Sequence, residues 1–579
     1  MLYPQRNAAR ELLCLDGCWR FWAEKQEGVQ QSAVRKNGLI DSIPMAVPGS
    51  WNEQYTDLFD FHGKGWYETR VTVPEHWKEV RTFLRLGAVT GKATVWVNGQ
   101  LALEHTGSAL PMEAEVTPFL KYGEENRIVV LADSTLDPWA LPPAQIEESE
   151  ARDGFYKSYP AINYDFYPYG GIQRSVFLYT TREKYIQDMV ITTPDTDGTV
   201  CFRIRLSEAV TGTLTIRIAD REEKYLLSGQ DEAEGSLKIE NPKLWDIGQP
   251  NLYRLRAELV CDGEKDLYEE SFGIRTVCVR QDAFLLNGRP VFFHGFGKHE
   301  DFFVLGKGFS HAVAIKDFSL LKWVGANSFR TSHYPYDEEM LRYADEAGIM
   351  VIAETPFVGL CDRMYRQDIL DKAKGVIEEM IARDKNHPSI VMWSLANEPG
   401  IDAQEESSRR AEVFFEEMQK TARRMDGTRP LTYVAYQEPE NNKPFRFFDV
   451  VCLNKYYGWY IGSGRIDGTL SNLDACLERF RKAFGKPMII TEFGADAIEG
   501  IHHDPPLMYS EEFQEKIILE QYRLFCSKPY IIGTHVWAFA DFQTTQTTAR
   551  PLYNRKGIFT RDRQPKMAAH ALRREWRRA

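Results

Sequence analysis

Two glutamates stand at the ends of short apolar runs, where their side chains could take part in acid and base chemistry. Glu398 closes the run that begins at Ile390 and is followed by Pro399, which cannot continue a strand ladder. Glu492 closes a second apolar run, MIITE, further along the chain. A single carboxylate at a strand end is most often a cap or turn residue, but two of them are what cleavage of a glycosidic bond requires.

The elements that must position these glutamates form a repeating pattern after the Asn287-Gly288 turn. Eight apolar runs alternate with helical patterns through the last 290 or so residues, which is typical of a (β/α)8 barrel. Glu398 then ends strand four and Glu492 ends strand seven, so both lie at the C-terminal mouth, where barrel enzymes carry their catalytic groups. The predicted strands are 290–299, 326–335, 349–356, 390–399, 430–436, 450–457, 487–494 and 531–540.

Other polar and aromatic side chains end predicted strands on the same rim. For each of them alone a structural role is as well supported as a functional one, but their convergence on one face favours a binding site. They are His294 and His299 on strand one, His333 on strand two, Asn454, Tyr456 and Tyr457 on strand six, and Trp537 and Asp541 on strand eight.

Two all-β domains precede the barrel, and we place the domains at 1–181, 182–276 and 277–579. In the first, Val95-Trp96-Val97 leads into Asn98-Gly99, a strong hairpin signal because this pair tolerates positive φ. Its last part begins as a loop rich in Tyr, Pro and Gly, a suitable place for functional residues. The second has about seven short predicted strands and resembles an immunoglobulin-type sandwich.

Composition excludes several classes of function. The chain has 71 basic and 83 acidic residues, a net charge of −12, and no long block of one sign, which argues against a nucleic-acid partner. We expect no membrane span and a cytoplasmic location, because no apolar run reaches 18 residues and charged residues interrupt the N-terminus. Nine scattered cysteines without a C-x-x-C pair, and His502-His503 without a third ligand, predict neither a metal site nor a cofactor.

Specific motifs give the chain a family resemblance over nearly its whole length. It resembles glycoside hydrolase family 2, and within it the β-glucuronidases. The resemblance implies a jelly-roll-like sugar-binding β-sandwich, an immunoglobulin-like β-sandwich and a TIM barrel, in that order. The motifs that carry it are GFGKHED (295–301), TSHYPY (331–336), RDKNHPSIVMWSLANEP (383–399), LNKYYGWY (453–460), ITEFGAD (490–496) and NRKGIFTRDRQPK (554–566).

The resemblance also implies roles for the two glutamates. Glu398 would be the acid/base and Glu492 the nucleophile of a retaining, double-displacement hydrolysis of terminal β-D-glucuronides, with the two carboxyl groups about 5 to 5.5 Å apart. This agrees with the physical requirement that the acid have a raised pKa while the nucleophile stays ionised.

Further residues match positions that bind the sugar in the family. Asn397 would bind the 2-hydroxyl group, and the Tyr460 hydroxyl would approach the nucleophile. Asn554 and Lys556, the N-x-K motif, would grip the C6 carboxylate of the sugar through charge-assisted hydrogen bonds. The others are Asp165, His333, Asn454 and Trp537, which would line the sugar pocket, and Arg550, a further basic residue near the motif.

Several alternatives stay open at this point. A β-galacturonidase would use the same carboxylate grip, a β-galactosidase would follow if residues 550–566 were only a solvated basic loop, and a catalytically silent carbohydrate-binding protein would need neither glutamate. The short connection at 357–367 predicts an open mouth suited to bulky glucuronides. The resemblance also implies a homo-oligomer, either a dimer or a tetramer.

Overall fold

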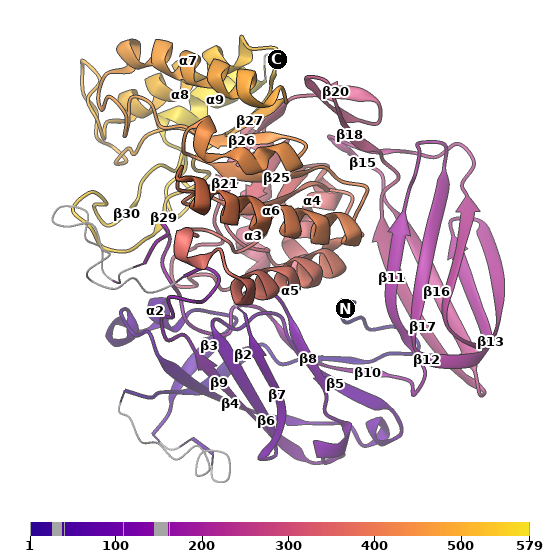
Figure 1. Ribbon diagram of the computed structural model, residues 1–579. Coiled ribbons are helices and arrows are strands. Elements are labelled where there is room, and N and C mark those ends of the chain that lie inside the picture. Colours follow the sequence, from indigo (N-terminus) through magenta and orange to yellow (C-terminus); the bar gives the residue numbers. More distant parts are fainter. Residues whose placement is uncertain are drawn as a thin grey trace.

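The computed structural model of the chain describes residues 2–25, 38–39, 41–107, 109–143, 160 and 162–577. Figure 1 shows two β-rich bodies, in indigo and magenta, against a body of mixed helices and strands in orange and yellow. The predicted fold class, two β-sandwich domains followed by a (β/α)8 barrel, is confirmed.

The first domain consists of two antiparallel sheets that share one core. Trp19, Trp51 and Tyr67 pack in this core together with apolar residues from both sheets. The predicted turn is present, because Asn98 and Gly99 have φ values of 49° and 82°. One sheet has the order β1 (Leu12–Cys14), β10 (Val176–Thr181), β5 (Arg81–Leu86) and β8 (Met112–Glu115), and the other has the order β3 (Ile43–Val47), β2 (Gly17–Ala23), β4 (Lys64–Thr72), β9 (Glu125–Asp133), β6 (Lys92–Val97) and β7 (Gln100–Thr106), with the short helix α2 (Trp51–Gln54) beside them.

The second domain has fewer and longer strands than the sequence suggested. The segments around Phe202 and Leu214 form one strand, β12, whose register shifts between Arg205 and Val210. A bulge of this kind bends a strand without ending it, so no turn is needed. The strands are β11 (Ile186–Thr192), β12 (Thr199–Ile218), β16 (Tyr253–Cys261) and β17 (Glu264–Phe272) in this order, with β13 (Arg221–Lys238) paired to β12.

The C-terminal domain is a closed barrel of eight parallel strands, one at each predicted position. The strands are β21 (Phe293–Lys298), β22 (Ser328–Thr331), β23 (Met350–Glu354), β24 (Ile390–Asn397), β25 (Leu431–Ala435), β26 (Val451–Asn454), β27 (Met488–Glu492) and β28 (Ile531–Val536). The helices are α3 (His311–Val324), α4 (Glu338–Ala347), α5 (Gln367–Asp384), α6 (Glu405–Met425), α7 (Ile466–Phe484), α8 (Glu511–Cys526) and α9 (Met567–Trp576), and two further strands, β29 (Phe542–Gln543) and β30 (Tyr553–Asn554), pair beyond β28.

Local signals fix several helix ends. Asp337 caps α4 by accepting a hydrogen bond from the Glu339 amide, and Ser510 caps α8 in the same way from Phe513. Gly325 and Gly348 end α3 and α4 with positive φ, the conformation that glycine adopts without steric cost. These ends set where each following strand enters the barrel.

Two small sheets cover the N-terminal end of the barrel, and Trp245 belongs to one of them. Trp245 and Phe284 belong to one apolar cluster with barrel residues such as Phe293 and Met350. The Trp245 indole also donates a hydrogen bond of 2.8 Å to the Asp345 carbonyl oxygen. The elements of this cover are β14 (Trp245–Asp246), β15 (Gln249–Pro250), β18 (Val277–Arg280), β19 (Ala283–Leu286) and β20 (Arg289–Val291).

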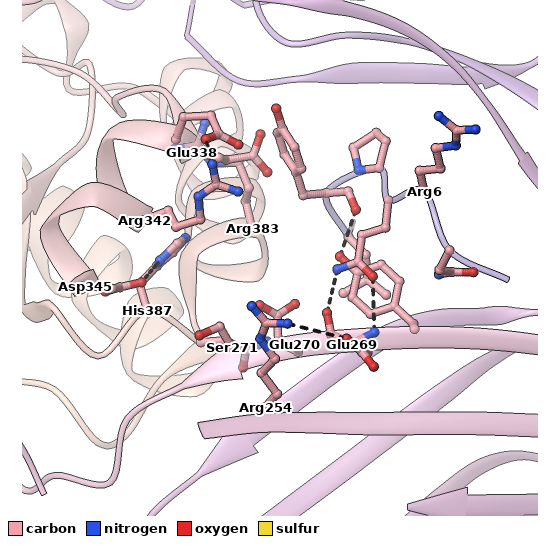
Figure 2. Close-up of a pocket in the computed structure, with 18 of the residues that line it drawn as sticks. Arg6, Arg254, Glu269, Glu270, Ser271, Glu338, Arg342, Asp345, Arg383 and His387 are labelled. Carbon is pink, nitrogen blue, oxygen red and sulfur yellow. Dashed lines mark hydrogen bonds and ion pairs between the residues drawn. The ribbon is translucent and has the colours of Figure 1, made fainter. Parts of the chain in front are cut away.

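An N-terminal arm lies between the second domain and the barrel. Asn7 donates a hydrogen bond of 2.9 Å to the Leu267 carbonyl, and Arg10 forms an ion pair of 2.7 Å with Asp266. Figure 2 shows Arg6 of this arm in a pocket whose other sides carry Glu269 of β17 and Arg342 of α4. Among the described residues, no helix is long and apolar enough to cross a membrane.

Candidate active site

Glu398 and Glu492 face one cavity of about 690 Å³ at the C-terminal mouth of the barrel. Glu492 is the last residue of β27 and is 4% exposed. Glu398 directly follows β24, and its backbone adopts a φ of 47° while its amide donates to the Val434 carbonyl on β25. This turn directs the chain out of the strand at the rim.

Two donors hold the Glu492 carboxylate. Arg330 of β22 donates a hydrogen bond of 2.5 Å to Oε1, and the Tyr456 hydroxyl donates one of 2.7 Å to Oε2. The sequence had assigned this hydroxyl to Tyr460, and that assignment is wrong. Tyr456 follows β26 almost directly, whereas Tyr460 lies four residues further along a turn, where its hydroxyl accepts a hydrogen bond of 2.7 Å from Arg550.

A neutral side-chain amide holds the Glu398 carboxylate. Asn454, the last residue of β26, donates a hydrogen bond of 2.7 Å to Oε1 of Glu398 and lies 3.2 Å from the Asn397 side-chain oxygen. The Thr491 hydroxyl donates a hydrogen bond of 3.0 Å to the side-chain oxygen Oδ1 of Asn454, which fixes the orientation of the side-chain amide. The amide nitrogen of Asn454 therefore points at Glu398.

The two glutamates are electrostatically unequal. Burial raises the pKa of Glu398, against the hydrogen bond from Asn454. Burial also raises the pKa of Glu492 to about 8, with Arg330 opposing the shift and the nearby Glu398 adding to it. Two interacting carboxyl groups lose their protons as a pair, and one of them ionises before the other. Because only Glu492 contacts a guanidinium, the negative charge is best held there and the proton on Glu398.

His333 and Trp537 form one wall of the cavity. Their rings are stacked with centroids 5.1 Å apart, and His333 Nδ1 lies 2.7 Å from Oε1 of Glu354. Burial lowers the pKa of His333 to about 4, so the imidazole is neutral at pH 7. Arg330 also binds Glu354 at 2.7 Å, and this buried ion pair orients the guanidinium that holds Glu492.

Asp165 reaches the barrel from the first domain. Its carboxylate accepts hydrogen bonds from Arg550 at 2.5 Å, from Asn554 at 2.7 Å and from Thr544 at 2.9 Å. Three residues expected in the substrate site, from two domains, are thus brought together. Asp165 and Arg550 line the cavity, whereas Asn554 is fully buried behind them.

The loop that carries Asp165 is anchored by the next side chain. Phe166 is 4% exposed and packs in the apolar cluster of the barrel and not in that of its own domain. Its ring centroid lies 5.1 Å from that of His299 and 5.6 Å from that of Tyr334. The Tyr167 amide adds a hydrogen bond of 3.0 Å to the Gln543 carbonyl.

Lys556 is enclosed by aromatic rings and paired with an acid. Its ammonium group lies 4.9 Å from the centroid of the Tyr460 ring and 5.2 Å from that of Trp459, and it forms an ion pair with Asp496. Although burial opposes ionisation, Lys556 lowers the pKa of Asp496. The Lys556 side chain is 1% exposed and does not line the cavity, so it adjoins the site from behind Tyr460.

Comparison with known proteins places this geometry in a family. The description "Glycosyl hydrolases family 2, TIM barrel domain" matches residues 277–579, the sugar binding domain of the same family matches 12–182, and a further family 2 domain matches 184–275. The chain belongs to glycoside hydrolase family 2.

Relatives within the family are similar over the whole chain. A β-glucuronidase of Paenibacillus borealis is 42% identical, covering 100% of this chain and 98% of that protein, and the human β-glucuronidase is 40% identical, covering 100% and 92%. A solved structure of Bifidobacterium dentium β-glucuronidase with coumarin-3-O-glucuronide has a TM-score of 0.94 at 38% identity, covering 100% of this chain and 98% of that one.

Sequence reasoning missed three charged residues of this family 2 site. Arg330 and Glu354 lie within or at the end of barrel strands, where a polar residue inside an apolar run was the available signal. Asp496 lies in the quoted ITEFGAD motif four residues after Glu492, so its position was visible but its partner was not. With them, the site has the charged groups needed to hold one carboxylate ionised and a second one protonated.

Proposed function

We propose that the chain is a retaining, exo-acting β-glucuronidase that releases terminal β-D-glucuronic acid from conjugates or glycans. The observation that carries this proposal is that one cavity exposes both glutamates and, beside them, the Arg550 guanidinium. Glycosidic cleavage needs the pair, and a uronate needs a cation in the same pocket. The named activity of the full-length relatives supports the same reading.

In the first step Glu492 attacks the anomeric carbon and Glu398 gives its proton to the departing oxygen. Arg330 and Tyr456 hold Glu492 ionised and aim its oxygens. Burial raises the pKa of Glu398, which keeps it protonated until the leaving group needs the proton. In the second step Glu398, now a carboxylate, activates the water that releases glucuronic acid.

Neutral side chains around the pair orient the sugar ring. Asn397 and Asn454 lie beside Glu398 and can hydrogen-bond the 2-hydroxyl group, an interaction that strengthens as positive charge develops in the transition state. His333 and Trp537 present a neutral, flat wall for the sugar.

The C6 carboxylate would bind near Arg550, Asn554 and Tyr460. Arg550 has the more accessible charge, since its side chain is 13% exposed and that of Lys556 is 1%. Lys556 would act from behind the Tyr460 ring, where Asp496 balances its charge in the empty site. Asp165 accepts hydrogen bonds from Arg550 and Asn554, and the C6 carboxylate would take over some of these hydrogen bonds.

The outer part of the cavity would receive the aglycone. Val358 and Cys361 belong to the short connection after β23, and together with Tyr436 and Ile461 they line the cavity toward solvent. A wall this short leaves room for extended substrates. We also propose a dimer or tetramer, which rests on the family resemblance, and light scattering measures it.

A panel of nitrophenyl glycosides tests the proposed activity. We expect turnover of the β-D-glucuronide and little of the β-D-glucoside or β-D-galactoside, with the β-D-galacturonide as the closest competitor because it keeps the carboxylate. Turnover of neutral sugars at an equal rate would overturn the uronate assignment. No release from any glycoside would overturn the enzyme assignment.

Replacing Lys556 by Met tests the carboxylate site. We expect the kcat/KM ratio of glucuronide to glucoside to fall about 100-fold, because removing the cation behind the Tyr460 ring weakens binding of the charged substrate only. Lys566→Met is the matched control, since Lys566 is equally buried and paired with Asp541 at 2.8 Å, whereas it is Lys556 that lies 4.9 Å from the ring of Tyr460, which lines the cavity. An equal drop of the ratio in both variants would show a structural effect.

A further inference from the structure

A cleft at the other end of the barrel carries an excess of positive charge. It has a volume of about 340 Å³ and lies between β11 and β12 of the second domain and the segments that precede β24 and β25. Among the described residues, two carboxylates line it, Asp188 and Asp426, against six cationic side chains in a protein of net charge −12. The six are Arg203, Arg205, Arg275, Lys385, Arg424 and Arg429.

Three of the six cations are neutralised by the protein itself. Lys385 pairs with Asp188 at 2.8 Å, and Arg429 pairs with Asp426 at 2.6 Å. Arg424 pairs at 2.6 Å with Glu378, which lies outside the cleft. Both acids of the cleft are therefore used, and Arg203, Arg205 and Arg275 remain.

Arg275 is buried without a counter-ion. It is 6% exposed, and its Nε and Nη2 atoms donate to the carbonyls of Pro388 at 3.0 Å and Ile390 at 2.9 Å. Within the described part of the chain it forms no ion pair, and its Nη1 donates no hydrogen bond. Burial, and after it the neighbouring Arg429 guanidinium, lower the pKa of Arg275 to about 9. A desolvated cation of this kind is costly unless an anion meets it.

Two more guanidinium groups come from one face of β12. Arg203 and Arg205 are two positions apart in the strand, so their side chains point to the same side, and both are exposed. Arg203 lies 3.9 Å from Glu232 and from Glu234, at the outer limit of an ion pair. Arg205 has no ion pair with a residue that the structure describes. Their long stems let both groups turn toward the cleft.

The adjacent pocket in Figure 2 shows that charge excess is not a general property of this domain junction. That pocket, of about 500 Å³, also has Lys385 in its lining, yet its charges are largely matched. His387 binds Asp345 at 2.5 Å, Arg342 pairs with Glu339, and Glu338 accepts from Arg85 at 2.8 Å. In this adjacent pocket these charges meet a partner, whereas Arg275 of the first cleft has no ion-pair partner among the described residues.

We propose that this cleft binds a tetrahedral oxyanion, a phosphate or sulfate group, either free or as the monoester of a small molecule. The planar guanidinium fork matches two oxygens of such a group, and a dianion can meet three arginines at once. The volume exceeds that of one inorganic ion, which leaves room for an ester group. Because the cleft and the glutamates lie at opposite ends of the barrel, this site is independent of the proposed hydrolysis.

Calorimetric titration of the whole chain tests the proposal, with inorganic phosphate, inorganic sulfate and glycerol phosphate as probes and chloride at equal ionic strength as background. Saturating D-glucuronic acid is present to occupy Arg550. We expect binding of one oxyanion per chain, at least about tenfold weaker in Arg203→Ala/Arg205→Ala. Both positions lie on an exposed strand face, so the variant should fold, and its thermal midpoint in chloride checks this.

Arg254→Ala is the matched control, because Arg254 is a 79% exposed arginine on β16 of the same domain and lies outside the cleft. It should change the affinity less than about twofold. A stronger signal with glycerol phosphate than with phosphate would assign the site to esters, and the reverse to the free ion. Equal binding by the double variant and the parent protein, or no binding beyond that of chloride, would overturn the proposal.

Discussion

The two ends of the barrel handle buried arginines in opposite ways. At the mouth, Arg330 lies between two carboxylates, 2.7 Å from Glu354 and 2.5 Å from Glu492. At the base, Arg275 is also buried, but it meets backbone carbonyls and a second arginine. The first guanidinium is part of a closed network that holds a carboxylate ionised. The second has no ion-pair partner among the described residues, and the oxyanion that we propose for the cleft would supply one.

This difference shows how a buried charge can be read. A buried cation with all its ion-pair partners orients the groups around it, whereas a buried cation without a partner indicates a binding site for an anion. The same difference separates Lys556, whose charge Asp496 already balances, from Arg205 on the exposed face of β12. Substitutions of the same kind at both ends of the barrel can therefore test whether paired and unpaired cations behave differently.

The largest effect is expected from Glu492→Gln at the mouth. It should lower kcat on the glucuronide about 10⁴-fold or more, because the proposed nucleophile becomes a neutral amide. Asp426→Asn is the counterpart at the base, where it breaks the ion pair with Arg429. That variant should lose thermal stability and keep kcat, measured well below its midpoint. A similar loss of kcat in both would contradict the division between the two ends.

Replacing each buried arginine by methionine should lower the free energy of unfolding more at the mouth than at the base. Arg330→Met leaves Glu354 and Glu492 buried without a cation and should cost about 3–5 kcal/mol. Arg275→Met loses two hydrogen bonds but also removes a desolvated charge, so we expect a cost under about 2 kcal/mol. Scanning calorimetry in chloride buffer measures both. A larger cost for Arg275→Met would mean that its charge is already compensated.

Phe166→Ala should have a smaller effect that is specific to the mouth. Losing the ring that seats the loop in the barrel should free Asp165 from Arg550 and Asn554 and raise KM for the glucuronide about tenfold, with a smaller change in kcat. Phe166→Leu, which keeps the apolar anchor, should recover most of the affinity. If the two variants raised KM equally, seating of the loop would not be the cause.

The smallest effect is a pH dependence of stability at the base. Burial alone would lower the pKa of His387, but the Asp345 carboxylate raises it to about 9. A raised pKa stabilises the fold fully below the unfolded value of about 6.5, and this contribution is lost as pH rises through 9. The stability advantage over His387→Gln should therefore shrink by about 1–3 kcal/mol between pH 6 and pH 10.

Asp345→Asn serves as the partner variant for this measurement, because it removes the charge that His387 contacts at 2.5 Å. It should reduce the pH dependence as much as His387→Gln does, and the double variant should add little. Independent, additive effects would show that the two groups do not act as a pair.

Much of the barrel could be predicted from the sequence, because its signals are local. Runs such as Ile390–Asn397 are apolar on both faces, and helices such as α4 carry their own caps, so strand order and the rim positions of Glu398 and Glu492 followed. Tyr456 and Tyr460 show where this fails. They lie four residues apart in one loop, and only the path of the turn decides which hydroxyl reaches Glu492.

The order of strands and helices could be predicted from the sequence, as could the positions of Glu398 directly after β24 and of Glu492 at the end of β27, because each depends on residues close together in the chain. The ion-pair partners, in contrast, became known only from the tertiary structure. Asp165 and Arg550 are 385 residues apart, and Arg205 and Arg275 come to the base from separate strands and loops. Because the energy of an ion pair depends on the distance between the charges in space, a local sequence pattern does not show whether a buried charged residue is paired.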